Sequence, residues 1–177
     1  MRTRGAIGAV VAGAVILGAG SGLGHAEEGT VQALSSWQAR VRVFVTGPQQ
    51  AFMLGAFGGR LFVERESGAL DAAQLMCPAT IEADYEAKVQ RGQGRCVITT
   101  RGGDRVFARW TCSGQPDTGC AGKFTLTAGT GRLQGITGEG DLVLRLVWSE
   151  ILQMDRQETE YDLAGLAVWP ALRYRIP

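Results

Sequence analysis

Carboxylates, arginines and aromatic side chains are the residues of this chain that could do chemistry. The chain holds one histidine, His25, close to its N-terminus. No histidine follows residue 26. The mature chain therefore cannot use Ser-His-Asp catalysis, Cys-His catalysis or a histidine metal site. The sequence also lacks a G-x-S-x-G nucleophile turn, a phosphate-binding loop and a dinucleotide-binding fingerprint. We therefore name no catalytic residue, expect no cofactor, and favour binding over catalysis.

A group of six side chains could contact a ligand. They are Trp37, Phe62, Glu64, Tyr85, Arg109 and Trp110. The aromatic residues could line an apolar cavity, although core packing explains them more simply. A carboxylate inside an apolar barrel, such as Glu64, could act as an acid or base, and Arg109 could bind an anion. The alternative for both charged residues is a solvent-exposed position on a strand.

The four cysteines predict two disulfides. They are Cys77, Cys96, Cys112 and Cys120, an even number that indicates disulfides in an exported chain. Cys112 and Cys120 flank a turn-forming segment, so we expect them to pair and to leave Cys77 for Cys96. The alternative is a four-thiolate zinc site, but its usual C-x-x-C pairs are absent.

Metal binding has one further candidate, an acidic row. Glu82, Asp84 and Glu86 have the spacing of calcium ligands. The row lacks the glycine-bearing loop of a calcium site, so it is also explained as the solvated face of a strand. We expect no metal.

The N-terminus predicts export. Arg2 and Arg4 precede an uncharged stretch, residues 5–24, with an apolar centre at residues 9–17. The stretch ends in Gly-His-Ala before Glu27, which is the pattern of a cleaved signal peptide. The alternative is a membrane anchor, although the apolar centre is short for a span of about 20 residues. We expect a signal peptide over residues 1–26, a mature domain over residues 27–177, and a periplasmic or secreted location.

Size and charge limit the partners. A chain of 177 residues less such a signal suits one domain. Its formal charge of +1 at pH 7 becomes about neutral without Arg2 and Arg4, and no basic block occurs. We therefore expect no nucleic-acid partner and membrane contact only through the signal peptide. The oligomeric state is left open.

Hydrophobic alternation predicts strands throughout the mature chain. Apolar and polar residues alternate over residues 37–45, 81–89, 106–111 and 142–148, as expected of half-buried strands. Glycine-rich segments at residues 92–94, 102–104 and 129–131 read as turns between strands. About eight to ten strands without a long helical pattern indicate an all-β fold, a single antiparallel β-barrel.

One segment resembles a known family. The sequence FTLTAGTGRLQGITGEG over residues 124–140 is similar to the strand–glycine turn–strand segment of allene oxide cyclases and dirigent proteins. Ala128 and Leu133 stand where glycine and phenylalanine are commoner in that superfamily. The resemblance covers residues 123–147 and implies an allene oxide cyclase-like, or calycin-like, barrel. No catalytic residue of the cyclases can be matched to a position here.

A second resemblance is to small exported bacterial proteins of undefined function. They share the pattern Arg-Cys-Val-Ile-Thr-Thr and Trp-Thr-Cys-x-Gly, found here at residues 95–100 and 110–114.

These observations leave three hypotheses for function. The first is a periplasmic barrel that binds a small, mainly apolar molecule. The second is a cofactor-free isomerase or cyclase that acts by confining its substrate, and a carboxylate buried in an open lumen would favour it. The third is a non-catalytic envelope interaction protein, which a filled lumen would favour.

Overall fold

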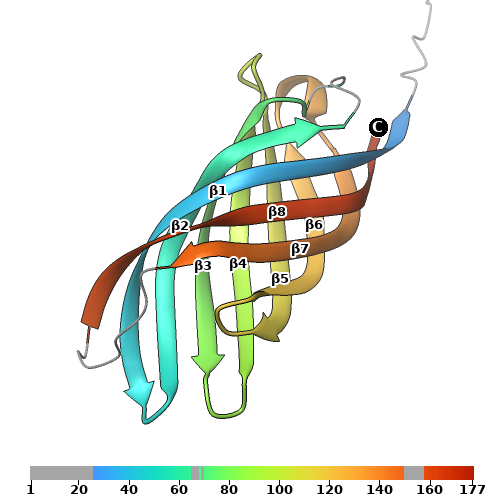
Figure 1. Ribbon diagram of the computed structural model, residues 1–177. Coiled ribbons are helices and arrows are strands. Elements are labelled where there is room, and N and C mark those ends of the chain that lie inside the picture. The colour runs from blue at the N-terminus through green and yellow to red at the C-terminus, as the bar shows by residue number, and fades with distance from the viewer. Residues whose placement is uncertain (1–25, 65–67, 69, 150–157) are drawn as a thin grey trace, which may run out of the picture.

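The protein is a closed antiparallel β-barrel (Figure 1). The computed structural model describes residues 26–64, 68, 70–149 and 158–177, so all but the last residue of the predicted signal peptide lies outside them. The described residues form eight strands, each paired with its neighbours in chain order: β1 (Glu27–Gly47), β2 (Gln50–Val63), β3 (Ala73–Asp84), β4 (Val89–Thr99), β5 (Arg105–Gln115), β6 (Gly119–Gly129), β7 (Thr137–Ser149) and β8 (Glu158–Ile176). The predicted all-β barrel is confirmed.

Alternation of side chains gives the barrel its apolar inside and polar outside. In β1, Trp37 and Val41 are buried while Gln38 and Arg40 are exposed, as expected when successive side chains point to opposite faces. The pattern ends near the strand end, where Val45 is already 36% exposed.

The two ends of the chain close the barrel. β1 pairs with β8 in an antiparallel register that runs from Glu27 opposite Ile176 to Phe44 opposite Glu158, with one irregularity between Val31 and Ala33. In Figure 1 the blue first strand and the red last strand lie side by side along the front of the barrel. Closure leaves the sheet without an unpaired edge, which removes a template for aggregation.

The alternating run at residues 81–89 is a hairpin and not one strand. β3 ends at Asp84, a turn follows over residues 85–88, and β4 begins at Val89. Lys88 takes a positive φ of 54°, and the Asp84 carboxylate accepts a 2.8 Å hydrogen bond from the Ala87 amide. This hydrogen bond holds the pKa of Asp84 below its ordinary value, with help from the Gln50 side chain.

The glycines at residues 92–94 lie inside β4 and do not form a turn. Their role is to make room for Trp110 on the neighbouring strand β5. A Cβ atom built on Gly94 would lie 2.6 Å from the Trp110 indole nitrogen, and one on Gly92 would lie 3.0 Å from the same ring. The indole therefore packs flat against a strand without side chains at these two positions, a use of glycine expected where another group approaches the backbone closely.

A short 3₁₀ helix, η1 (Gly131–Leu133), carries the connection between β6 and β7. Gly131 has a positive φ of 57°, as its place in the glycine turn implies. Arg132 belongs to this helix and not to the next strand, and its guanidinium forms a 3.0 Å ion pair with Asp104.

Candidate functional site

The centre of the lumen is filled by aromatic side chains. The Trp37 and Phe57 rings meet edge to face with centroids 4.9 Å apart, and Phe124 and Trp169 do so at 5.3 Å. The cavity among these rings has a volume of about 20 Å³. A space of this size holds about one water molecule, so the middle of the barrel is a packed core.

One end of the barrel is closed by side chains from its connections. Leu70 comes from the β2–β3 connection, Leu133 from η1, and Ile136 from the residues before β7, and they are 6%, 2% and 1% exposed. Only a cavity of about 20 Å³ remains beside them. These three residues act as a plug over the lumen.

The opposite end carries a pocket, which we call the mouth pocket. Its volume is about 50 Å³, and it is lined by Trp37, Met53, Phe57, Ile81, Tyr85, Gln90, Asp117, Gly119, Cys120, Leu144, Leu146 and Leu163. The lining is mainly apolar and comes from β1, β2, β3, β4, β6, β7 and β8 and from two turns. An apolar concavity with a few polar groups is the usual form of a small-molecule site.

Tyr85 brings a polar group to this pocket from the β3–β4 turn. Its backbone amide donates a 2.8 Å hydrogen bond to the Gln49 carbonyl in the adjacent β1–β2 turn, which ties the two turns together. Its hydroxyl is buried and has no hydrogen-bond partner. Burial, followed by the charge of Asp117 and the proximity of Tyr161, raises the pKa of Tyr85 to about 12. The phenol is therefore a protonated donor at neutral pH.

Trp37 brings a second polar group from β1. The residue is 6% exposed, and its indole nitrogen is buried without a hydrogen-bond partner. Gly165 on β8 leaves the space that this ring occupies, because a Cβ atom there would overlap the indole. A buried donor without an acceptor is costly, so two unpaired donors on residues that line one pocket call for an explanation.

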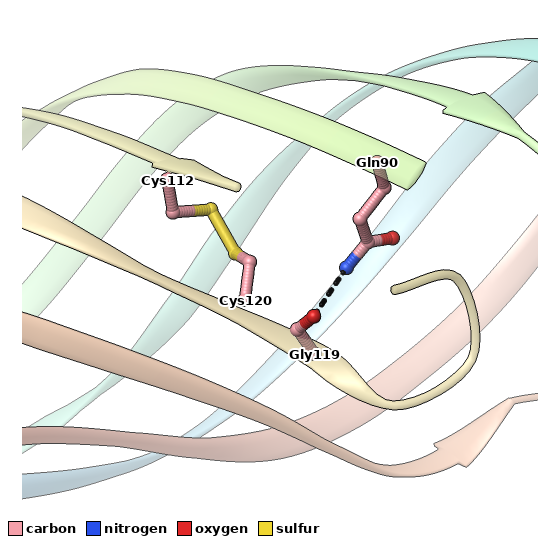
Figure 2. Close-up of a disulfide and its surroundings, with 4 residues drawn as sticks. All are labelled: Gln90, Cys112, Gly119 and Cys120. Atoms are coloured by element: carbon pink, nitrogen blue, oxygen red, sulfur yellow. Dashed lines mark hydrogen bonds between the residues drawn. A yellow bond between two sulfur atoms is a disulfide. The ribbon is translucent and has the colours of Figure 1, made fainter. Parts of the chain in front are cut away.

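The rim of the pocket is fixed by a disulfide and a hydrogen bond (Figure 2). The Cys112–Cys120 disulfide joins β5 to β6 next to the β5–β6 turn. From β4, the Gln90 side-chain amide donates a 3.0 Å hydrogen bond to the Gly119 carbonyl. These links hold the turn that carries Asp117, whose φ is 62°.

The six candidate residues of the sequence analysis divide between the two faces of the barrel. Trp37 and Tyr85 line the mouth pocket, and Trp110 lines the inner cavity. Phe62, at 44% exposed, lies on the outer face. The remaining two, Glu64 and Arg109, are also exposed. The structure therefore brings together three of the six and leaves the others outside the lumen.

Arg109 lies opposite Arg95 on β4, both on the outer face. Because alternate positions of one strand share a face, Arg91 on β4 and Arg105 on β5 also face outward, each four positions from this pair and toward opposite ends of the two strands. The linear sequence hides this arrangement, since the four arginines are spread over 19 residues.

Both predicted disulfides are present. Cys77 pairs with Cys96 and Cys112 with Cys120. Two disulfides indicate an oxidising, extracytoplasmic environment. Within the described ranges no cluster of three or more histidine, cysteine or acidic side chains could hold a metal ion. In the same ranges, no helix is long and apolar enough to span a membrane.

Several lining residues were missed by the sequence analysis. Asp117 lies in the β5–β6 turn, and Leu163 lies on β8. Asp117 follows a proline within the loop between two cysteines, which is the one local signal of an ordered turn there.

Comparison with known proteins gives a weak structural likeness. No protein-family model matches the chain, and no curated protein matches it. A solved structure of a pterocarpan synthase dirigent protein is similar over 84% of this chain and 94% of that chain, with 10% sequence identity and a TM-score of 0.35. We base no conclusion about function on a likeness at this level.

Proposed function

We propose that this protein binds a small, mainly apolar molecule at the mouth pocket and does not catalyse a reaction on it. The observation that carries the proposal is the asymmetry of the barrel. One end is plugged by Leu70, Leu133 and Ile136, while the other holds an apolar pocket whose lining residues Tyr85 and Trp37 each carry a buried, unpaired donor. A barrel that served only as a packed scaffold would gain stability from pairing or removing these donors.

The size of the pocket limits what can enter it. A dry cavity that accepts benzene measures about 150 Å³, whereas the mouth pocket measures about 50 Å³. Only the narrow end of a ligand therefore fits, such as a short chain or a substituent on a ring. The rest of the molecule lies at the rim formed by the turns.

The second candidate function is a non-catalytic envelope interaction protein with a filled core. The packed centre of the lumen, with its cavity of about 20 Å³, favours it. The isomerase alternative calls for a buried carboxylate, and the buried polar residues in the described part of the chain are Ser35 and Thr100. No observation in these residues favours that alternative.

We further propose a periplasmic or secreted location. The disulfides support an extracytoplasmic site of folding, and the signal-peptide pattern of residues 1–26 supports export. Which of the two compartments applies depends on the cell envelope of the source organism.

Native mass spectrometry of protein purified from its own compartment tests the binding proposal. We expect a species heavier than the chain by the mass of one small molecule. Leu146→Trp on β7 fills the mouth pocket that Leu146 lines and should abolish the adduct. Leu166→Trp on β8 is the matched control, because Leu166 is 41% exposed on the outer face, and it should retain the adduct.

Two results would contradict the proposal. If wild-type protein carries no adduct, the filled-core alternative is correct. If Leu146→Trp retains the adduct as fully as Leu166→Trp, a molecule binds elsewhere on the barrel.

A further inference from the structure

We propose that the molecule held at the mouth pocket is neutral and carries a hydrogen-bond acceptor, such as a ketone, ester or ether oxygen, that binds the Tyr85 hydroxyl. This inference rests on the proposed function and specifies its ligand class. The apolar part of the ligand lies against Ile81, Leu146 and Leu163, and the acceptor points inward.

The unpaired donors carry the argument for an acceptor. In the described part of the chain, four buried side-chain polar atoms lack a hydrogen-bond partner, and two of them are carried by residues that line the mouth pocket, Trp37 and Tyr85. The Trp37 indole nitrogen can only donate a hydrogen bond. The Tyr85 hydroxyl, which is protonated at neutral pH, can also donate one. A site built from donors selects a ligand with acceptors and rejects its hydrocarbon analogue.

Charge carries the argument for a neutral ligand. Among the twelve lining residues, the one charged side chain is that of Asp117, and its negative charge acts on the Tyr85 hydroxyl. An anionic ligand would meet this carboxylate in an apolar setting without a compensating cation among the described lining residues. A carboxylate ligand is therefore disfavoured relative to a ketone of the same shape.

Water is the competing partner for the Tyr85 hydroxyl. A pocket of about 50 Å³ has room for a water molecule, but a buried water usually makes about three hydrogen bonds. The lining is mostly aliphatic and aromatic, so the additional partners are few. A ligand oxygen needs no such partners, because the rest of the ligand replaces them with apolar contacts.

A pair of isosteric probes tests the acceptor. Acetophenone and α-methylstyrene have the same shape, but the second has a =CH2 group in place of the carbonyl oxygen. We expect wild-type protein, titrated by NMR, to bind acetophenone about tenfold more tightly, the effect of one hydrogen bond to an otherwise unpaired donor. The Trp37 indole N–H resonance should shift differently with the two probes. Their rings affect this resonance equally, so the difference reports the carbonyl oxygen.

Tyrosine-to-phenylalanine variants assign the effect. Tyr85→Phe should reduce the affinity ratio of the two probes to about twofold or less while leaving α-methylstyrene binding unchanged. Tyr174→Phe is the matched control, because Tyr174 lies at the plugged end and its hydroxyl donates to Glu27 at 3.1 Å. It should leave the ratio at its wild-type value. Benzoate, the anionic probe, should bind about tenfold more weakly than acetophenone.

The outcomes separate this inference from the proposed function. Equal binding of the two neutral probes to wild-type protein, or a ratio unchanged in Tyr85→Phe, overturns the acceptor while the pocket stands. Benzoate binding as tightly as acetophenone overturns the neutral ligand. If neither neutral probe binds, the mouth pocket is not a ligand site and both proposals fall.

Discussion

At the scale of single residues, Gly131 shows how one backbone angle is tied to its surroundings. Its φ of 57° is in the left-handed region, which a β-branched residue rarely adopts. A Cβ atom at this position would also overlap the Asp104 carboxylate, which pairs with Arg132 in the same turn. Glycine is therefore required twice, for the angle and for the space.

We predict that Gly131→Val lowers the free energy of unfolding by about 1–3 kcal/mol, the cost of a strained backbone position. Arg132→Ala should cost less than about 1 kcal/mol, because Arg132 is 78% exposed and a surface ion pair contributes little. Urea unfolding of both variants measures the difference. Equal midpoints for Gly131→Val and wild type would show that the turn tolerates side chains at this position.

Tyr85 predicts a loss of stability in alkaline solution. Its folded-state pKa of about 12 is raised above the ordinary value of 10.0, so folding opposes ionisation of the phenol. The stabilisation is complete below pH 10 and is lost as the pH rises toward 12. Between pH 10 and pH 12, the free energy of unfolding of the wild-type protein should fall by more than that of Tyr85→Phe, which has no ionisable group at position 85. Urea midpoints at pH 8 to 12 for both proteins test this, and parallel curves would contradict it.

At the scale of secondary structure, alternation identified four of the eight strands, and it did not show where one of these four ended. The run from Ile81 to Val89 alternates at every position, yet the chain reverses at residues 85–88. The residues of the turn happen to continue the alternation of apolar and polar side chains. In addition, neither Tyr85 nor Lys88 is a common turn residue. The reversal is specified by Asp84, which accepts a hydrogen bond from Ala87, and by the pairing of β3 with β4.

The glycines of β4 show the same limit of local information. Gly92 and Gly94 have the spacing of a turn, and their actual role depends on Trp110, which lies on another strand. A contact between residues 16 positions apart cannot be read from either segment alone. Only the register of β4 with β5, in which Gly94 lies opposite Trp110, explains it.

We predict that Gly94→Ala destabilises the barrel by about 1–3 kcal/mol through overpacking. The cost should be smaller in a Trp110→Leu background, where the nearest of the two crowding groups, at 2.6 Å, has been removed and Ala79 at 2.9 Å remains. Unfolding free energies of the four proteins form a double-mutant cycle. Additive effects would mean that the indole does not pack on Gly94.

The two disulfides close loops of different length in the chain. Cys77–Cys96 spans 19 residues and Cys112–Cys120 spans 8. In the chain-entropy model these loops correspond to about 3 and 2.5 kcal/mol of stability. Replacing each pair by alanines should lower the unfolding free energy in that order. A larger loss for the Cys112 and Cys120 pair would show that this disulfide also stabilises the rim of the mouth pocket directly.

At the scale of the whole molecule, the barrel could be predicted from the sequence, but the position of the site could not. Trp37 and Tyr85, two of the six candidate residues, line the mouth pocket, as buried aromatic residues are common on inward faces. Which end of the lumen is open depends on the plug residues Leu70, Leu133 and Ile136. These lie in connections, where no periodic pattern indicates the direction of a side chain.

The barrel begins next to the predicted end of the signal peptide. β1 begins at Glu27, which pairs with Ile176 and accepts a hydrogen bond from Tyr174. Cleavage after Ala26 would thus leave β1 complete. We predict that the intact mass of exported protein corresponds to a chain beginning near Glu27. A full-length species that retains Arg2 would contradict both the signal peptide and the compartment.

The seam between β1 and β8 has a consequence for how the chain folds. It joins residues about 150 positions apart, such as Glu27 and Ile176, so its hydrogen bonds form only after the chain has given up the entropy of a very long loop. Proteins dominated by such distant contacts fold in milliseconds to seconds, far more slowly than helical bundles. Until the seam closes, both terminal strands present free edges and an exposed apolar face. Closing the seam is therefore also the step before which unfolded chains are most exposed to one another.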